Sequence, residues 1–236
     1  MVACLKCYWS PEQIAGRLAL EGALCISYES IYRYIWRDWH NNGTLHLYLR
    51  RAQKQRKKHY GSSDSRGRVR GKRWIDERPA AANNRTEVGH LEIDTVIGPR
   101  GDNTCMLTMV DRKSGYVMIG KLANRSQHET ASRTRKLLSR HPGKLKTITA
   151  DNGTEFHNYA QVEAKTGVAY YFARPYKSND RALNENTNGL IRQYEPKKQS
   201  MAGLTQPRCN AIADALNHRP RKRLGYRTPA EVFEAE

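Results

Sequence analysis

Hydrophobic and polar positions follow two different rhythms along the chain. In residues 10–40 the apolar side chains recur every three or four positions, which is the spacing of amphipathic helices. The sequence SPEQ at 10–13 supplies a capping serine followed by proline, so a helix is predicted to begin at Pro11. Ser27 is expected to cap a second helix after a glycine-containing turn. The inward positions of that helix are expected to be Ile31, Tyr34 and Ile35.

From residue 87 onward the pattern changes to short runs in which apolar and polar residues alternate, as they do in strands. In the first run Leu91, Ile93 and Ile97 take the apolar positions. Five strands are predicted, over residues 90–98, 104–112, 116–122, 145–151 and 168–176. Helices are predicted over residues 126–141, 154–167 and 181–196. A strand hairpin followed by crossover helices indicates an α/β fold with a mixed five-stranded sheet and flanking helices.

These patterns divide the chain into three parts. Residues 1–48 have the spacing of a helix-turn-helix module, although an ordinary helical hairpin has the same pattern. If the module binds DNA, its second helix would offer Tyr28, Ser30, Arg33 and Arg37 to a groove or to phosphates. Residues 49–85 are predicted to be a basic flexible linker, because they are polar and repel one another. Residues 86–236 are predicted to form the α/β core with a C-terminal helical tail.

The charge of the chain points to a polyanionic partner. Its 41 lysines and arginines exceed its 23 acidic residues, which gives a formal net charge of +18. The excess is concentrated in residues 50–73, where eleven basic residues accompany one acidic residue. Neutralising phosphates with such residues releases counterions, so nucleic acid is the simplest partner. No apolar stretch is long enough to span a membrane, and the chain is expected to be cytoplasmic and associated with the nucleoid.

Three carboxylates are conspicuous in so basic a chain. Asp94 lies inside the first predicted strand, Asp151 ends the fourth, and Glu185 lies in the last predicted helix. Each alone has an ordinary interpretation as a cap or a salt-bridge partner. Together they would repel one another unless a cation lay between them, and carboxylate oxygens suit Mg²⁺ or Mn²⁺. Two such ions can support phosphoryl transfer on DNA.

The helix that carries Glu185 is predicted to have two distinct faces at about 100° per residue. The apolar face consists of Leu183, Thr187, Leu190, Ile191 and Tyr194. The opposite face consists of Glu185, Asn188, Gly189 and Arg192. A carboxylate, an amide and a guanidinium are therefore expected to point together toward the site.

Four motifs, GHLEIDTVIG, TADNGTEF, NENTNGLIRQYEPK and LNHRPRKRLGYRTPAEVF, resemble the bacterial insertion-sequence transposases of family thirty. These transposases belong to the integrase-core (DDE) group, which has an RNase H-like fold. The 33 residues between Asp151 and Glu185 match the separation in that family. The resemblance implies a catalytic and metal-binding triad of Asp94, Asp151 and Glu185, with Mg²⁺ or Mn²⁺ in two sites. DNA contacts are expected from four residues of the basic run and four around the last predicted helix, namely Lys54, Arg56, Lys57, Lys58, Arg181, Asn188, Arg192 and Lys197.

The resemblance also implies the partners, which are terminal inverted repeats, target DNA and further copies of the chain. Departures from the family bear on activity. The family has another helix-turn-helix ahead of this start, so the chain is expected to be truncated. In addition, Ser178-Asn179 replaces a Pro-Trp pair of the family, and Glu195 replaces an aromatic residue. Loss of the Trp and the added charge are expected to loosen the segment that carries Glu185, so that Glu185 is displaced without metal. An inactive DNA-binding remnant and a plain RNase H-type nuclease remain alternatives to a transposase.

Overall fold

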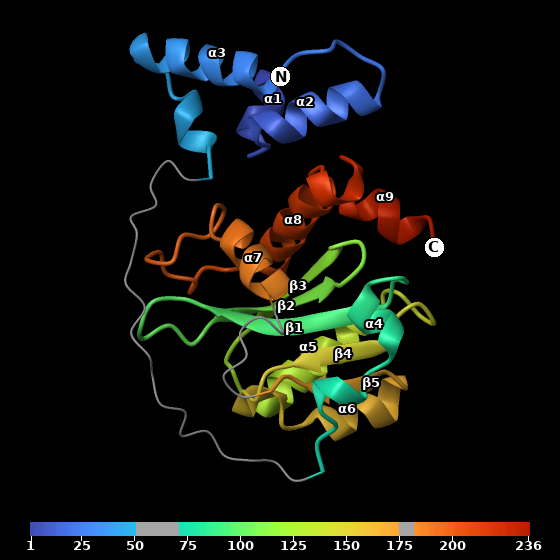
Figure 1. Ribbon diagram of the computed structural model, residues 1–236. Helices are drawn as coiled ribbons and strands as arrows, with labels where there is room; N and C mark the ends of the chain where they lie inside the picture. Colours follow the sequence, from blue (N-terminus) through green and yellow to red (C-terminus); the bar gives the residue numbers. More distant parts are fainter. Residues whose placement is uncertain (51–70, 175–181) are drawn as a thin grey trace. The chain divides into compact units, whose positions relative to one another are not determined.

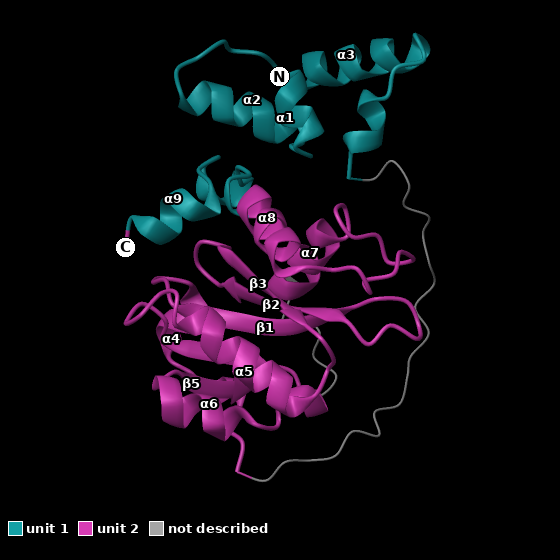
Figure 2. Ribbon diagram, turned by 180° about the vertical axis from the view of Figure 1, so that it is seen from behind, with its two compact units in different colours: residues 1–63, 217–235 teal, residues 64–216, 236 magenta. Residues whose placement is uncertain are grey.

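A computed structural model describes residues 1–50, 71–174 and 182–236 of the chain (Figure 1). It contains two compact units, residues 1–63 with 217–235 and residues 64–216 with residue 236 (Figure 2). Within the described ranges, no helix has both the length and the apolar character needed to cross a membrane.

The first unit is helical. Its elements are α1 (Val2–Lys6), α2 (Pro11–Leu20), α3 (Tyr28–His40), η1 (Leu45–Tyr48), η5 (Lys222–Leu224) and α9 (Pro229–Glu234). The predicted start of α2 is confirmed, because Ser10 and Gln13 accept hydrogen bonds from each other's backbone N–H in a capping box. The predicted interior of α3 is partly wrong. Ile31 and Ile35 are buried, but Tyr34 lies about 100° around the helix from Ile35 and is 44% exposed.

Residues 217–235 belong to this helical unit. Arg17 of α2 forms an ion pair with Glu231 of α9, with 2.7 Å between Nη1 and Oε1. Arg219 donates a hydrogen bond of 2.9 Å to the Gln13 side chain. The predicted boundary differs from this division for residues 217–235, which were grouped with the α/β core but contact α2 through this ion pair and this hydrogen bond.

The second unit is built on one mixed sheet. Its strands are β1 (His90–Ile97), β2 (Cys105–Asp111), β3 (Val117–Leu122), β4 (Thr147–Ala150) and β5 (Ala169–Phe172), in the order β3-β2-β1-β4-β5. The first three strands pair antiparallel, and β4 is parallel to both β1 and β5. All five strands were predicted, and so was the hairpin between β2 and β3.

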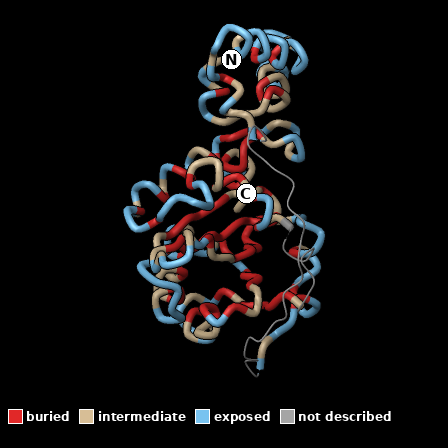
Figure 3. Tube along the Cα trace, turned by 90° about the vertical axis from the view of Figure 1, so that its left-hand side faces the viewer, coloured by how far each residue is buried: buried red, intermediate tan, exposed pale blue. Residues whose placement is uncertain are grey.

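Helices cover both faces of this sheet (Figure 1). The helical elements are η2 (Ile75–Glu77), α4 (Ala80–Asn84), α5 (Gln127–Leu138), η3 (Thr154–Phe156), α6 (Tyr159–Thr166), α7 (Ala182–Ile191) and α8 (Gln206–Asn217). One core joins β1, β2 and β3 to α7 and α8 through Val96, Ile119, Leu190, Ile212 and similar residues. Buried parts of the trace lie inside the sheet unit and also in the helical unit, where Leu5, Ile14, Ile31, Ile35 and Leu45 form a second core (Figure 3). Ile97, predicted to be apolar and inward, is 47% exposed as the last residue of β1, whereas its neighbour Val96 is buried on the opposite face.

The linker prediction for residues 49–85 is wrong over its last part. The chain forms η2 and α4 there, and the Phe172 N–H donates to the Arg73 carbonyl at 2.9 Å. Trp74 pairs in parallel with Phe172, so this segment adds to the edge strand β5. The edge strand β5 has backbone groups that are free to pair, and pairing with them orders residues 73–74, which the composition of the segment does not predict.

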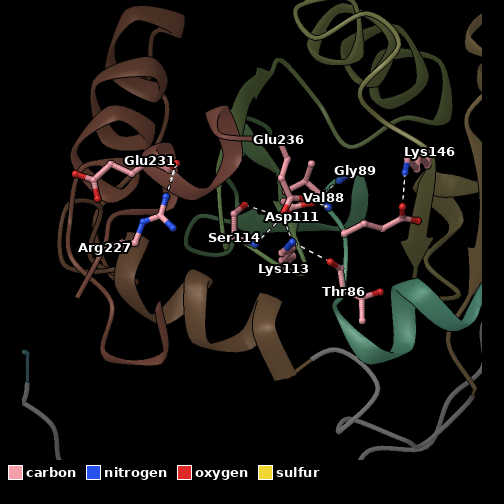
Figure 4. A network of polar contacts seen from close by, with 11 residues as sticks. Thr86, Val88, Gly89, Asp111, Lys113, Ser114, Lys146, Arg227, Glu231 and Glu236 are labelled. Atoms are coloured by element: carbon pink, nitrogen blue, oxygen red, sulfur yellow. Dashed lines mark hydrogen bonds and ion pairs between the residues drawn. The ribbon is translucent and has the colours of Figure 1, made fainter. Parts of the chain in front are cut away.

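A polar network fixes the turn between β2 and β3 (Figure 4). The Asp111 carboxylate accepts hydrogen bonds from the Gly89 N–H at 2.8 Å and from both the N–H and the hydroxyl of Ser114. Gly115 follows with a φ of 76°, which only glycine adopts without strain. This network ties the start of β1 to the hairpin and thereby fixes the position of β1.

Candidate active site

Asp94 and Asp151 occupy equivalent positions on adjacent parallel strands. Glu92 of β1 pairs with Thr149 of β4, and each aspartate lies two residues further on. Because side chains alternate along a strand, residues two apart point to the same face. By this register Asp94, inside β1, lies on the sheet face that α7 covers, and Asp151, the first residue after β4, is its neighbour at the carboxyl end of the adjacent parallel strand. Ligands bind at this end of the strands in α/β sheets.

Helix α7 is attached directly to Asp94. The Asn188 side-chain amide donates a hydrogen bond of 2.9 Å to Asp94 Oδ2, and the Thr95 N–H donates to Oδ1 at 2.8 Å. Thr108 of β2 lies 3.3 Å from both the Asp94 carbonyl and the Asn188 amide oxygen. Asn188 was predicted to contact DNA, but in this structure its amide orients the Asp94 carboxylate.

Asp151 shares its surroundings with a second carboxylate. The Gly153 N–H donates to Asp151 Oδ1 at 2.8 Å, and a Cβ on Gly153 would lie 2.8 Å from that oxygen and 2.5 Å from Glu155 Oε2. Glu155 is buried, and its Oε1 accepts a hydrogen bond of 3.0 Å from the Thr95 hydroxyl. Its Oε2 is buried and has no hydrogen-bond partner. This orphaned oxygen beside Asp151 suits a hard divalent cation such as Mg²⁺.

Glu185 is not gathered with the two aspartates. Its side chain is exposed on the first turn of α7, one helical turn before Asn188. Within the described ranges, no three His, Cys, Asp or Glu side chains lie close enough together to hold a metal ion. The strand register thus makes Asp94 and Asp151 neighbours on adjacent strands, and α7 contacts Asp94 through Asn188, while the Glu185 side chain is exposed.

A buried ion pair beneath the site was missed from the sequence. Glu92, which is 1% exposed, forms an ion pair with Arg112 and accepts a hydrogen bond of 3.1 Å from the Asn184 N–H. Burial raises the pKa of the Glu92 carboxyl, and the positive charge of Arg112 opposes that rise. Glu92 thus provides an acceptor for the first turn of α7, next to Glu185. The sequence signal that could have identified Glu92 is its position two residues before Asp94, which places both side chains on the same face of β1.

The other predicted residues of this region lie at the surface or in structural contacts. Arg192 donates a hydrogen bond of 2.6 Å to the Ile97 carbonyl, and burial lowers the pKa of its guanidinium. Lys197 is exposed. Glu195 does not carry an unpaired charge into this segment, because Arg208 donates to its Oε1 at 2.8 Å. Ser178, Asn179, Arg181 and the basic-run residues Lys54, Arg56, Lys57 and Lys58 lie outside the described residues.

The four residues predicted to contact DNA from α3 lie on two different faces. Ser30, Arg33 and Arg37 are exposed within about 60° of one another, on the side away from Ile31. Tyr28 is 46% exposed but lies on another face, with Tyr32, Trp36 and Trp39. The Ser30 hydroxyl is already 3.1 Å from the capping Ser27 hydroxyl.

Comparison with known proteins agrees with this architecture. Residues 85–178 match the integrase core domain family. A chain in the simian T-cell lymphotropic virus intasome, solved in complex with PP2A regulatory subunit B56 gamma, has a similar fold, with a TM-score of 0.53 and 16% identity. That match covers 64% of this chain and 55% of the other. The fold is therefore integrase-like and RNase H-like, as predicted.

Insertion-sequence transposases match almost the whole chain. The transposase for insertion sequence element IS4351 of Bacteroides fragilis is 42% identical over 99% of this chain and 72% of its own length. Transposase InsI for IS30A of Escherichia coli is 37% identical over 98% of this chain, which spans 62% of that relative. Transposases of this integrase-core group generally use divalent metal ions. The chain belongs to the IS30-type family of insertion-sequence transposases.

Proposed function

We propose that this chain catalyses metal-dependent phosphoryl transfer on DNA, in the cleavage and strand-transfer steps that move an insertion sequence. The observation that carries the proposal is the equivalent register of Asp94, inside β1, and Asp151, directly after β4, on adjacent parallel strands. Helix α7 supports it, because its Asn188 is bonded to Asp94 and its Glu185 lies one turn away. Glu185 would complete the site by turning inward from its exposed position.

Asp94, Asp151 and Glu185 would hold Mg²⁺ or Mn²⁺ in two sites. When bound, such ions activate a water or 3′-hydroxyl and stabilise the leaving oxygen of a phosphodiester. Residues of the chain itself orient the carboxylates that would bind these ions. The Asn188 amide and the Thr95 N–H hold the Asp94 carboxylate in one orientation, and the Gly153 N–H does the same for Asp151. Such preorganisation lowers the cost of assembling the site on DNA.

The DNA partner would be duplex DNA carrying terminal inverted repeats, followed by target DNA. The exposed basic face of α3 and the basic run support this proposal, since a net charge of +18 favours a polyanion. Oligomerisation on DNA is proposed because two ends must be joined, and because the virus integrase with a similar fold was solved as an intasome. Contacts are proposed for Tyr28, Ser30, Arg33, Arg37, Lys54, Arg56, Lys57, Lys58, Arg181, Asn188, Arg192 and Lys197.

Cleavage of repeat-bearing DNA tests the proposal. The reaction should require Mg²⁺ or Mn²⁺ and should disappear in Asp94→Asn, Asp151→Asn and Glu185→Gln while circular dichroism stays unchanged. Glu234→Gln removes an exposed carboxylate in the helical unit and should retain full activity. Retained cleavage in Asp94→Asn or Asp151→Asn would overturn the assignment.

A non-catalytic DNA-binding protein is the second candidate, and the exposed position of Glu185 favours it. It predicts DNA binding of the same salt dependence but no cleavage with either metal ion. Calorimetric titration with Mn²⁺ separates the two candidates, because a transposase site binds the ion and a remnant does not.

A further inference from the structure

Lys72 is the residue of the basic run that the structure brings to the candidate site. Its Nζ donates a hydrogen bond of 3.0 Å to the Asn152 side-chain oxygen, directly after Asp151 in sequence. The Asn152 amide in turn donates at 3.0 Å to the Ala173 carbonyl, so the acceptor of Lys72 is itself fixed. The ammonium lies 4.5 Å from the centre of the Phe172 ring and is attracted by the charge of Asp151.

The backbone around Lys72 is held in place on both sides. Trp74 pairs in parallel with Phe172, and the Arg73 carbonyl accepts the Phe172 N–H. Arg73 also forms an ion pair with Glu163 and lies 5.2 Å over the Tyr171 ring. Before Lys72, the Gly71 carbonyl accepts a hydrogen bond of 3.2 Å from the Tyr159 hydroxyl. These contacts belong to different elements, so the position of Lys72 is set by the sheet and not by the linker.

We propose that Lys72 is a DNA-positioning residue, whose ammonium binds a phosphate oxygen of the DNA strand beside the Asp151 carboxylate. The inference rests on the proposed function. A DNA phosphate that approaches a group of carboxylates meets like charge, and a fixed cation at the edge of that group offsets the repulsion. The Asn152 amide and the Phe172 ring hold the cation, and Asp151 supplies a counter-charge until the phosphate arrives.

An alternative is that Lys72 only stabilises the added edge strand. The two roles predict different results for Lys72→Met, which keeps most of the stem over Phe172 and removes the charge. A structural role lowers the unfolding midpoint and leaves the electrostatics of DNA binding unchanged. A DNA-positioning role changes the salt dependence of DNA binding and leaves the unfolding midpoint close to that of the wild type.

The experiment measures the affinity for repeat-bearing duplex DNA between about 50 and 200 mM salt, without divalent metal, in the full chain. Lys72→Met should lower the log–log salt slope by about 0.9, the value for one lost phosphate contact on duplex DNA. Lys72→Arg should restore the slope. Lys165→Met is the matched control, because it removes an exposed positive charge from the same unit, on α6. It should leave the slope unchanged.

Cleavage kinetics provide the second readout. Lys72→Met should raise KM for DNA several-fold, with a smaller change in kcat, because the residue binds substrate and does not hold metal. The proposal is overturned if Lys72→Met has the same log–log salt slope as the wild type. It is also overturned if Lys165→Met lowers that slope as much as Lys72→Met does. The proposed function fails separately, through absence of Mn²⁺ binding and cleavage in the wild type, and the salt slope still decides the role of Lys72.

Discussion

Removing the Arg112 guanidinium should destabilise the sheet unit strongly. Glu92 is 1% exposed, so Arg112→Met leaves a buried carboxylate that still accepts a hydrogen bond from the Asn184 N–H but has lost its counter-charge. Breaking one side of a buried ion pair costs about 3–5 kcal/mol. That loss is a large part of the roughly 5–15 kcal/mol that stabilises a typical domain. Urea unfolding at pH 7, followed by circular dichroism, measures it directly.

The pH dependence of this loss has a definite sign. Burial already raises the pKa of the Glu92 carboxyl above its ordinary value, and Arg112 opposes that rise. Without Arg112 the pKa in the folded state rises further, so the folded variant binds a proton that the unfolded chain has released. The deficit of Arg112→Met relative to wild type should therefore be small below about pH 4, the ordinary range of a glutamate, and grow as pH rises.

Double variants separate the stability of this pair from its positioning of α7. Glu92→Gln with Arg112→Met removes both charges but keeps an acceptor for the Asn184 N–H, so stability and DNA cleavage should both recover in part. Glu92→Leu with Arg112→Met should recover stability and lose cleavage, because α7 loses its acceptor next to Glu185. The reasoning is refuted if Arg112→Met costs less than about 1 kcal/mol, or if the single losses simply add.

Two further predictions concern the site loop and the cysteines. Gly153→Ala should weaken Mn²⁺ binding at least about tenfold, while the unfolding free energy changes by less than about 1 kcal/mol. The φ of Gly153, −59°, admits alanine, but the new Cβ would displace the Asp151 carboxylate. The control variant Gly203→Ala, at a position with open space around it, should bind Mn²⁺ as the wild type does. Equal Mn²⁺ affinities of Gly153→Ala and wild type would contradict the prediction. Burial raises the pKa of the Cys105 and Cys209 thiols to about 11 each, so a disulfide reagent at pH 8 should label the other three cysteines first. Rapid labelling of all five in the folded protein would contradict their burial.

The sequence predicted what depends on local chemistry. The predicted capping serines of α2 and α3 accept backbone N–H groups as expected, because a cap and its partner lie within one turn. The five strands followed from alternation, and the apolar face of α7 proved correct at Leu190 and Ile191, which are buried. Predictions failed where a single alternating series was extended to the end of a strand, as at Ile97.

The features that the sequence did not predict depend on pairing between residues far apart in the chain. Arg112 neutralises Glu92 across the β1–β2 pair, and composition offers no means of matching one arginine among many to one buried glutamate. Lys72 belonged to a segment predicted to be flexible, yet it is ordered by the edge of β5, about one hundred residues later. The triad was proposed through a family resemblance, and only the strand register shows that two of its members are neighbours.

The central claim is that Asp94, Asp151 and Glu185 hold divalent metal together. Anomalous scattering from crystals of the full chain with repeat-bearing DNA and Mn²⁺ tests it most directly. The account predicts anomalous peaks within about 2.0–2.2 Å of oxygens of Asp94 and Asp151, with Glu185 turned inward to a peak. Mn²⁺ bound at other residues, or a DNA complex with no peak between the two aspartates, would contradict it.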